Sequence, residues 1–308
     1  MQIRTDLAME SRHLAENIQG VNCKTIRHGT IEETHVIIES DEAAEALSKA
    51  KGTYITLSCE GMWQADVAER SELMHALSSV LKGLLPPFGD ILIIGLGNRH
   101  ITADALGSRV LEGILVTRHM KNVISDSLQG RLRGVCAVAP GVLGITGIET
   151  AEMVKGVVEH TRPAALIAID ALAAREANRI CTTIQVTDTG ILPGSGVGNH
   201  RLGITRETMG IPVIAIGVPM VVYASVIARD GLSMLLDDMG MDQEAHEPAI
   251  EALVKKISAR ELGDMVVTPR EVDVLVGRVA SIIAEGLNMA LQPRLSEEEI
   301  SLLTHDSM

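Results

Sequence analysis

Residues 90–107 read DILIIGLGNRHITADALG, and this stretch decides the fold class. Residues 91–94 are all apolar, which is typical of a central parallel strand covered on both faces. Gly95 and Gly97 end the strand, because glycine takes positive φ freely and lets another backbone come close. Asp104 follows just beyond the carboxyl end of the strand, where open α/β sheets bind their ligands.

A second stretch, residues 164–170, repeats this pattern with the sequence AALIAID, and the helix-like residues 171–179 follow it. Carboxyl groups at the ends of two strands can face one crevice. Ionising both there costs free energy because the like charges repel, so one group keeps its proton. Asp104 and Asp170 are therefore the candidate catalytic pair, acting as general acid and general base. The alternative is that each aspartate only caps the helix after it, because a carboxylate accepts the free N–H groups of a first turn.

The rest of the chain predicts a wound α/β sheet, because strand and helix patterns alternate from residue 90 onward. The sheet is expected to be mostly parallel with helices on both faces, and two earlier β-like segments are expected to add N-terminal edge strands. The predicted strands are residues 34–40, 53–60, 91–94, 134–139, 164–169, 182–187 and 212–217. The predicted helices include residues 7–17, 71–85, 104–116 and 269–291.

Two helix starts carry the capping-box pattern, in which Ser or Thr is followed three residues later by Glu. Thr146 and Glu149 form one such pattern and predict a helix that begins there. Thr268 and Glu271 form the other, with Pro269 at the first position of the longest predicted helix.

The composition of the 308 residues restricts the class of protein. A hydrophobic content of 46% provides for a large core, and an aromatic content of 1% argues against stacking on nucleic acid bases. The net charge of −13 disfavours contact with phosphate backbones, and it is also the ordinary solubilising charge of a cytosolic protein. The cysteines are scattered without a CxxC pair, which favours reduced thiols. With no signal peptide and no apolar run of about 18 residues, a cytoplasmic protein without membrane contact is expected.

Two further motifs offer other chemistry. The glycine-rich sequence GSGVG can cradle a phosphate or an oxyanion with backbone N–H groups, or it is a tight loop that needs glycine to turn. Its candidate residues are Gly194, Ser195, Gly196 and Gly198. The GLG of residues 95–97 is only a fragment of a dinucleotide fingerprint, so no cofactor is predicted. His100 stands four residues before Asp104, but a lone histidine near an acid is more often a hydrogen-bonded neighbour than a ligand, so no metal is predicted.

Longer motifs are distributed along nearly the whole chain. They are RTDLAME at residues 4–10, GLGN and ITADALG within residues 95–107, APGVLGITGIET at 139–150, IAIDALAAR at 167–175, DTGILPGSGVGN at 188–199, GIPVIAIGVP at 210–219 and MVVTPREVD at 265–273. In type and order these motifs resemble those of the spore germination protease family.

The resemblance implies an endopeptidase, made as a zymogen, that degrades small acid-soluble spore proteins during germination. It implies an atypical aspartic-type peptidase with a fold like that of hydrogenase maturation peptidases, assembled as a homotetramer in the spore core. The family's two catalytic aspartates match Asp104 in ITADALG and Asp170 in IAIDALAAR. Two rival functions stay open. One is a metal-assisted maturation peptidase that uses His100 and an aspartate as ligands, and the other is a non-catalytic protein whose acidic surface binds a basic partner.

The resemblance also implies a substrate pattern of an acidic residue, a large apolar residue, Ala, any residue and Glu, cut after the acid. Residues 6–10, DLAME, fit this pattern, so a cut between Asp6 and Leu7 is expected. The alternative is a frayed tail whose sequence is incidental. The expected organisation is a leader of residues 1–6 and a single peptidase domain of residues 7–308, in which residues 237–261 form a peripheral helical decoration.

Overall fold

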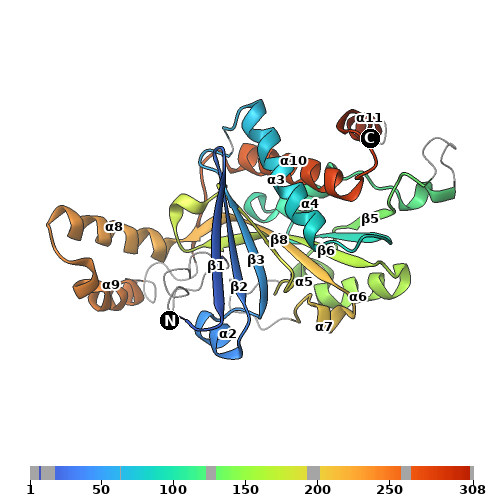
Figure 1. The fold of residues 1–308 in the computed structure, drawn as a ribbon. Helices are drawn as coiled ribbons and strands as arrows, with labels where there is room; N and C mark the ends of the chain where they lie inside the picture. The colour runs from blue at the N-terminus through green and yellow to red at the C-terminus, as the bar shows by residue number, and fades with distance from the viewer. Residues whose placement is uncertain are drawn as a thin grey trace.

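A mixed β-sheet forms the centre of the computed structural model, which describes residues 7, 18–62, 64–122, 130–192, 202–257 and 265–305. The strands are β1 (Val21–His28), β2 (Ile31–Ile38), β3 (Gly52–Ser58), β4 (Ile91–Gly95), β5 (Val135–Val138), β6 (Ala165–Ala174), β7 (Thr183–Thr187), β8 (Val213–Tyr223) and β9 (Val266–Val267). They lie in the order β1-β2-β3-β7-β8-β6-β4-β5, and β9 pairs with β8 (Figure 1).

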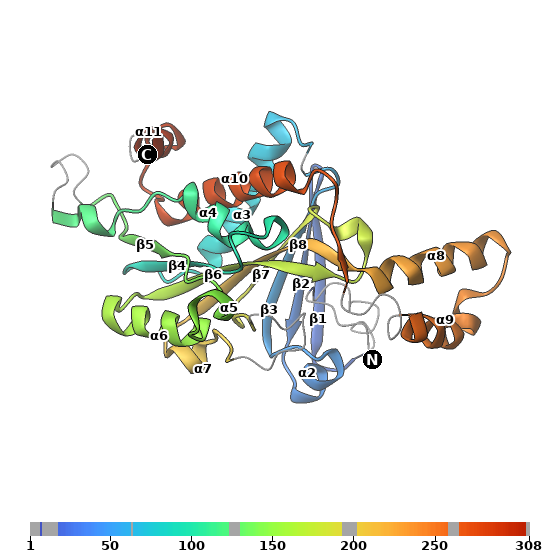
Figure 2. The same cartoon turned by 180° about the vertical axis from the view of Figure 1, so that it is seen from behind.

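Helices cover both faces of the sheet. The α-helices are α2 (Asp41–Leu47), α3 (Val67–Leu84), α4 (Leu106–Glu112), α5 (Leu143–Thr146), α6 (Thr150–Thr161), α7 (Arg206–Met209), α8 (Ala224–Asp238), α9 (Gln243–Ile257), α10 (Val272–Leu291) and α11 (Glu297–His305). Short 3-10 helices span Thr102–Asp104, Arg118–Asn122 and Ala177–Arg179. In both views α3, α4 and α10 lie over one face and α2, α6 and α7 over the other (Figures 1 and 2).

The sheet has a parallel half and an antiparallel half. Strands β8, β6, β4 and β5 pair in parallel, whereas β1, β2, β3 and β7 pair antiparallel and β7 joins the two halves through β8. The expected α/β fold class, the helices on both faces and the N-terminal edge strands are confirmed. The expectation of a mostly parallel sheet was wrong, because β7 runs antiparallel to β8 and the strands β3, β2 and β1 continue the sheet from β7 in antiparallel pairs.

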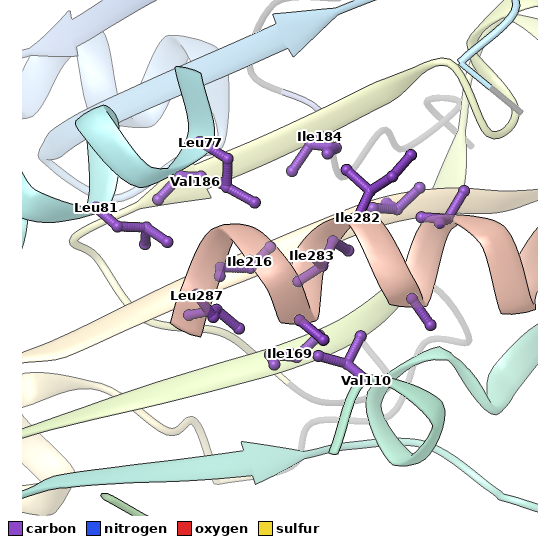
Figure 3. Close-up of a cluster of buried hydrophobic side chains, with 14 of the residues drawn as sticks. Leu77, Leu81, Val110, Ile169, Ile184, Val186, Ile216, Ile282, Ile283 and Leu287 are labelled. Carbon is purple, nitrogen blue, oxygen red and sulfur yellow. The ribbon is translucent and has the colours of Figure 1, made fainter. Parts of the chain in front are cut away.

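The larger core lies between the sheet and the helices α3, α4 and α10. Figure 3 shows side chains of α10, including Ile283 and Leu287, pointing toward Ile169 and Ile216 of the central strands. These side chains are aliphatic, as the shortage of aromatic residues requires. A smaller cluster on the other face joins β4 and β6 to α6 and α7. Burial of these apolar surfaces provides the main stabilisation of the fold.

Helix α10 is the one described helix that is long and apolar enough to cross a membrane. Most of its apolar side chains are buried against α3, α4 and the sheet. Its composition is therefore that of a core helix.

Several local predictions were wrong. Residues 171–174 continue strand β6 and are not helical, because Ala171, Leu172 and Ala174 pair with the long strand β8. Helix α6 begins after Glu149, but no side-chain cap forms there, since the Thr146 hydroxyl donates to carbonyls of its own turn. Helix α10 likewise begins after Glu271 without a side-chain cap. The predicted helix 7–17 lies outside the described residues, except for Leu7.

Residues beyond β8 form a projecting pair of helices. Helices α8 and α9 pack against each other and extend away from the sheet in both views (Figures 1 and 2). The described part of residues 237–261 thus belongs to a helical extension of the sheet's end, which includes α8 as well.

Candidate active site

The chain turns sharply after β4, and glycines make this turn possible. Gly97 has φ +94°, and a Cβ at this position would overlap the carbonyl oxygen of Asp104. Gly95 is equally confined, because its Cβ would lie 2.5 Å from the carbonyl oxygen of Gly107. The loop therefore folds back on the strand end, and only glycine allows this close backbone approach.

Asp104 lies in this loop, at the end of a 3-10 helix that contacts β6, β8 and α10. Its Oδ2 accepts a hydrogen bond of 2.7 Å from the backbone N–H of Asn98. Helix α4 starts only after Ala105, and no side chain caps it. The carboxylate is thus bonded to the turn that follows β4, and the helix-cap alternative does not describe it.

Burial controls the acidity of Asp104. The loss of water around the half-buried side chain raises the pKa of this carboxyl above its usual range, and the hydrogen bond from Asn98 opposes part of that rise. Asp104 therefore keeps its proton to higher pH than an ordinary aspartic acid. A group of this kind suits a general acid.

Asp170 lies inside strand β6, one residue beyond the level at which β4 ends. Ile169 is paired with Gly95, and its carbonyl accepts from Leu96 N–H at 2.8 Å. Asp170 is 9% exposed, and its Oδ1 accepts from Ala171 N–H at 2.9 Å. It is a buried strand residue, and it does not cap a helix.

The two aspartates are held by adjoining parallel strands: Asp104 lies in the loop after β4, and Asp170 lies in β6. Gly107, three residues after Asp104, packs so tightly that a Cβ there would lie 2.6 Å from the carbonyl oxygen of Ile169, the residue before Asp170. The start of α4 therefore rests on β6 directly beside Asp170. Both carboxylates lie at the carboxyl edge of the parallel half, which is where α/β sheets bind ligands.

The strand register places a further polar side chain level with Asp170 across the sheet. Asp170 pairs with Gly217 of β8, and Gly217 pairs with Gln185 of β7. Ile169, Ile184 and Ile216 belong to the core under α10, so the residues that alternate with them face the opposite side of the sheet. Gln185 is buried on that side. Sequence reasoning missed it, and the only signal was a lone amide in the apolar segment TIQVT.

The glycine-rich candidates Gly194, Ser195, Gly196 and Gly198 lie outside the described residues. The base of their loop is described. Ile191 and Ile204 exchange two backbone hydrogen bonds, and Gly190 has φ +80° with the backbone of Ile204 against it. The two described ends of the loop, Ile191 and Ile204, are thus hydrogen-bonded to each other beside the parallel half of the sheet.

His100 is exposed, and its backbone N–H donates to Asn98 Oδ1 at 3.0 Å. Among the residues that the structure describes, no three His, Cys, Asp or Glu side chains gather closely enough to hold a metal ion. The four cysteines, all within the described ranges, form no disulfide with one another.

The expected cut lies between Asp6 and Leu7. Asp6 lies outside the described residues, and Leu7 lies within them. Leu7 is completely buried, and it packs against Leu172 and Ile191. Leu7 was expected as the first residue of the peptidase domain, and its docking against β6 was not predicted. Leu172 stands two residues after Asp170, on the same side of β6.

The fold and these side chains define an α/β protein with two aspartates, one half-buried and one buried, near the carboxyl edge of its parallel strands. The sequence profile of germination proteases matches residues 2–261. The chain belongs to the germination protease family and is a peptidase.

Relatives match nearly the whole chain. A germination protease of Clostridium tetani is 40% identical, with 98% of this chain and 99% of that protein covered. A germination protease of Bacillus subtilis is 37% identical, with 98% and 97% covered. Among solved structures, a nickel–iron hydrogenase maturation protease from Thermococcus kodakarensis is similar at 18% identity, with a TM-score of 0.32 and 68% of this chain covered.

Proposed function

We propose that this peptidase hydrolyses small acid-soluble spore proteins by general acid–base catalysis, with Asp104 and Asp170 as the catalytic residues. One observation carries this proposal. The two aspartates lie near the carboxyl edge of adjoining parallel strands, and Asp104 keeps its proton to higher pH than an ordinary aspartic acid. Membership of the germination protease family supports the substrate class.

We assign the role of general acid to Asp104, because burial raises the pKa of its carboxyl, and the role of general base to Asp170. Asp170 takes a proton from a water molecule whose oxygen bonds to the peptide carbonyl carbon, while Asp104 donates its proton to the carbonyl oxygen. Asp170 then returns a proton to the peptide nitrogen, the C–N bond breaks, and Asp104 recovers its proton from the collapsing intermediate.

Stabilisation of the tetrahedral intermediate is assigned to the glycine-rich loop. Backbone N–H groups of Gly194, Ser195, Gly196 and Gly198 are the candidate donors to the carbonyl oxygen, which gains negative charge as the water attacks and until Asp104 has protonated it. The glycine-rich sequence supports this role, because successive backbone N–H groups can cradle an oxyanion.

The protein is further proposed to be a precursor of residues 1–308 that is cut between Asp6 and Leu7, leaving residues 7–308 as the active form. It acts in the spore core as a homotetramer without a cofactor. These statements rest on the motif DLAME and on the resemblance to the family.

The decisive experiment incubates the purified protein with a small acid-soluble spore protein and identifies fragments by mass spectrometry. Discrete cuts after an acidic residue are expected. Asp104→Asn and Asp170→Asn should bind the substrate without cutting it, and cutting should survive exhaustive EDTA treatment. Loss of cutting in EDTA would favour the metal-assisted alternative, and binding without fragments in the unaltered protein would favour a non-catalytic binder. The rate should be bell-shaped in pH, with apparent constants that belong to the pair.

A further inference from the structure

The burial of Leu7 is unusual for its position in the chain. Residues 1–17 are mostly polar, yet the Leu7 side chain has no exposed surface and packs in a small apolar cluster with Leu172 and Ile191. The partners come from β6 and from the base of the glycine-rich loop. These are the two segments to which the proposed function assigns the base and the oxyanion donors.

The position of Leu172 is set by its neighbour across the sheet. Gly217 of β8 has no side chain, and the Leu172 side chain occupies the space in which a Cβ of Gly217 would lie. Leu172 therefore lies over β8, next to Asp170 on the same side of β6. The place that the Leu7 side chain fills against Leu172 and Ile191, two residues beyond the proposed base, is called the apolar recess.

We propose that Leu172 and Ile191 form the subsite for the apolar side chain that follows the cut bond, and that Leu7 fills this subsite in the precursor. This inference rests on the proposed function. The side chain that binds in this subsite must resemble that of Leu7, and so be aliphatic and about the size of leucine. A substrate can place its own apolar residue there only when Leu7 leaves.

The test expresses the full chain, lets it cut itself between Asp6 and Leu7, and then measures its cleavage of peptides that carry Leu, Phe or Ala after the acidic residue. The unaltered protein should prefer Leu to Ala by at least about tenfold, since a few buried methylene groups discriminate by that much. Leu172→Ala enlarges the recess and should shift the Phe-to-Leu ratio of kcat/KM upward by about tenfold or more. Ile191→Ala should shift it in the same direction.

Leu47→Ala is the matched control, because Leu47 is a buried leucine in the separate cluster under α2. It should lower the melting temperature as Leu172→Ala does and leave the ratio unchanged. If Leu172→Ala leaves the ratio unchanged while the unaltered protein cuts all three peptides, the subsite is wrong and the proposed function stands.

A second measurement does not depend on cleavage. In the Asp170→Asn full chain, Leu7→Ala and Leu172→Ala should each lower the melting temperature, and the double variant should lose less than the two losses combined, because the side chains touch. Additive losses would overturn the docking of Leu7. If the losses are coupled but the processed protein with Asp170 intact cuts no peptide, the proposed function and the substrate subsite are overturned, while the contact itself stands.

Discussion

Strands β4 and β6 share one sequence pattern, an apolar run followed by an aspartate. The structure holds the two aspartates in different ways. Strand β4 stops at Gly95, and a backbone turn carries Asp104 back over the strand end. Strand β6 continues to Ala174, so Asp170 is fixed by its place in the sheet. One carboxylate is thus supported by a loop that requires glycine and the other by strand pairing.

The largest effect is expected from Asp170→Asn, because an amide keeps the shape of the carboxylate but cannot take a proton. Cleavage of a spore-protein substrate should fall by about 10²–10⁴-fold, the usual contribution of a general base. The melting temperature should change little, since the Asn oxygen can still accept from Ala171 N–H. Near-normal cleavage by a folded variant would show that Asp170 is only structural.

The loop support of Asp104 is tested by Gly97→Ala. A methyl group there is strained by the positive φ, at about 1–2 kcal/mol, and it also overlaps the carbonyl oxygen of Asp104. The free energy of unfolding should fall by roughly 3 kcal/mol in total, and cleavage should be lost because Asp104 moves.

Gly61→Ala is the matched control for this effect. Gly61 also has positive φ, but a methyl group on its Cα would meet nothing within 4 Å, so only the conformational strain applies. Denaturant unfolding of both variants separates the two contributions. Equal losses would show that the contact between Gly97 and Asp104 carries no energy of its own.

Gly217→Ala tests the strand support of Asp170. The three atoms nearest to the new methyl group all belong to the side chain of Leu172, so the expected loss of stability is smaller, about 1–3 kcal/mol. Leu172 should be pushed into the apolar recess, and peptide preference should move toward Ala after the cut. Gly83→Ala, in a helix with open space around it, should raise stability by about 0.5–1 kcal/mol and leave the preference unchanged.

The smallest expected effect is the pH dependence of stability due to Asp104. Its pKa is higher in the folded than in the unfolded protein, so its contribution is present below the unfolded pKa and is lost as pH rises through the folded pKa. Asp104→Asn should therefore gain stability relative to the unaltered protein as pH rises from acid toward neutrality. Thermal unfolding at a series of pH values measures this difference.

Glu299 provides a control of opposite sign. The backbone N–H of Ser296 and the side chain of Arg131 lower the pKa of this carboxyl. Its contribution to stability is present above the unfolded pKa and is lost as pH falls through the folded pKa. Glu299→Gln should thus lose stability relative to the unaltered protein toward neutrality. If both variants follow the same trend, the burial of Asp104 does not govern its acidity.

Local patterns were sufficient to predict the strands that carry the site. Continuous apolar runs predicted β4 and the first half of β6, and glycine spacing predicted the turn before Asp104. The continuation of β6 beyond Asp170 was not predictable, because the alanine-rich residues 171–174 favour a helix and become a strand only by pairing with β8. Gln185 and the burial of Leu7 were missed for a similar reason, since their surroundings are made by segments distant in the chain.

The complete burial of Leu7 has an electrostatic consequence for the proposed cut. Before the cut, the nitrogen of Leu7 belongs to a neutral amide. Afterwards it becomes an ammonium group, and a buried ion costs several kcal/mol in lost hydration unless a counter-ion compensates for it. On the proposed cut, the new chain end stays in the apolar recess only if a carboxylate offsets this charge, and Asp170, two residues before Leu172, is the carboxylate that the proposed function places there. One hydrolysed bond would thus turn the hold on Leu7 from an apolar contact into one that also depends on the charge of the proposed base.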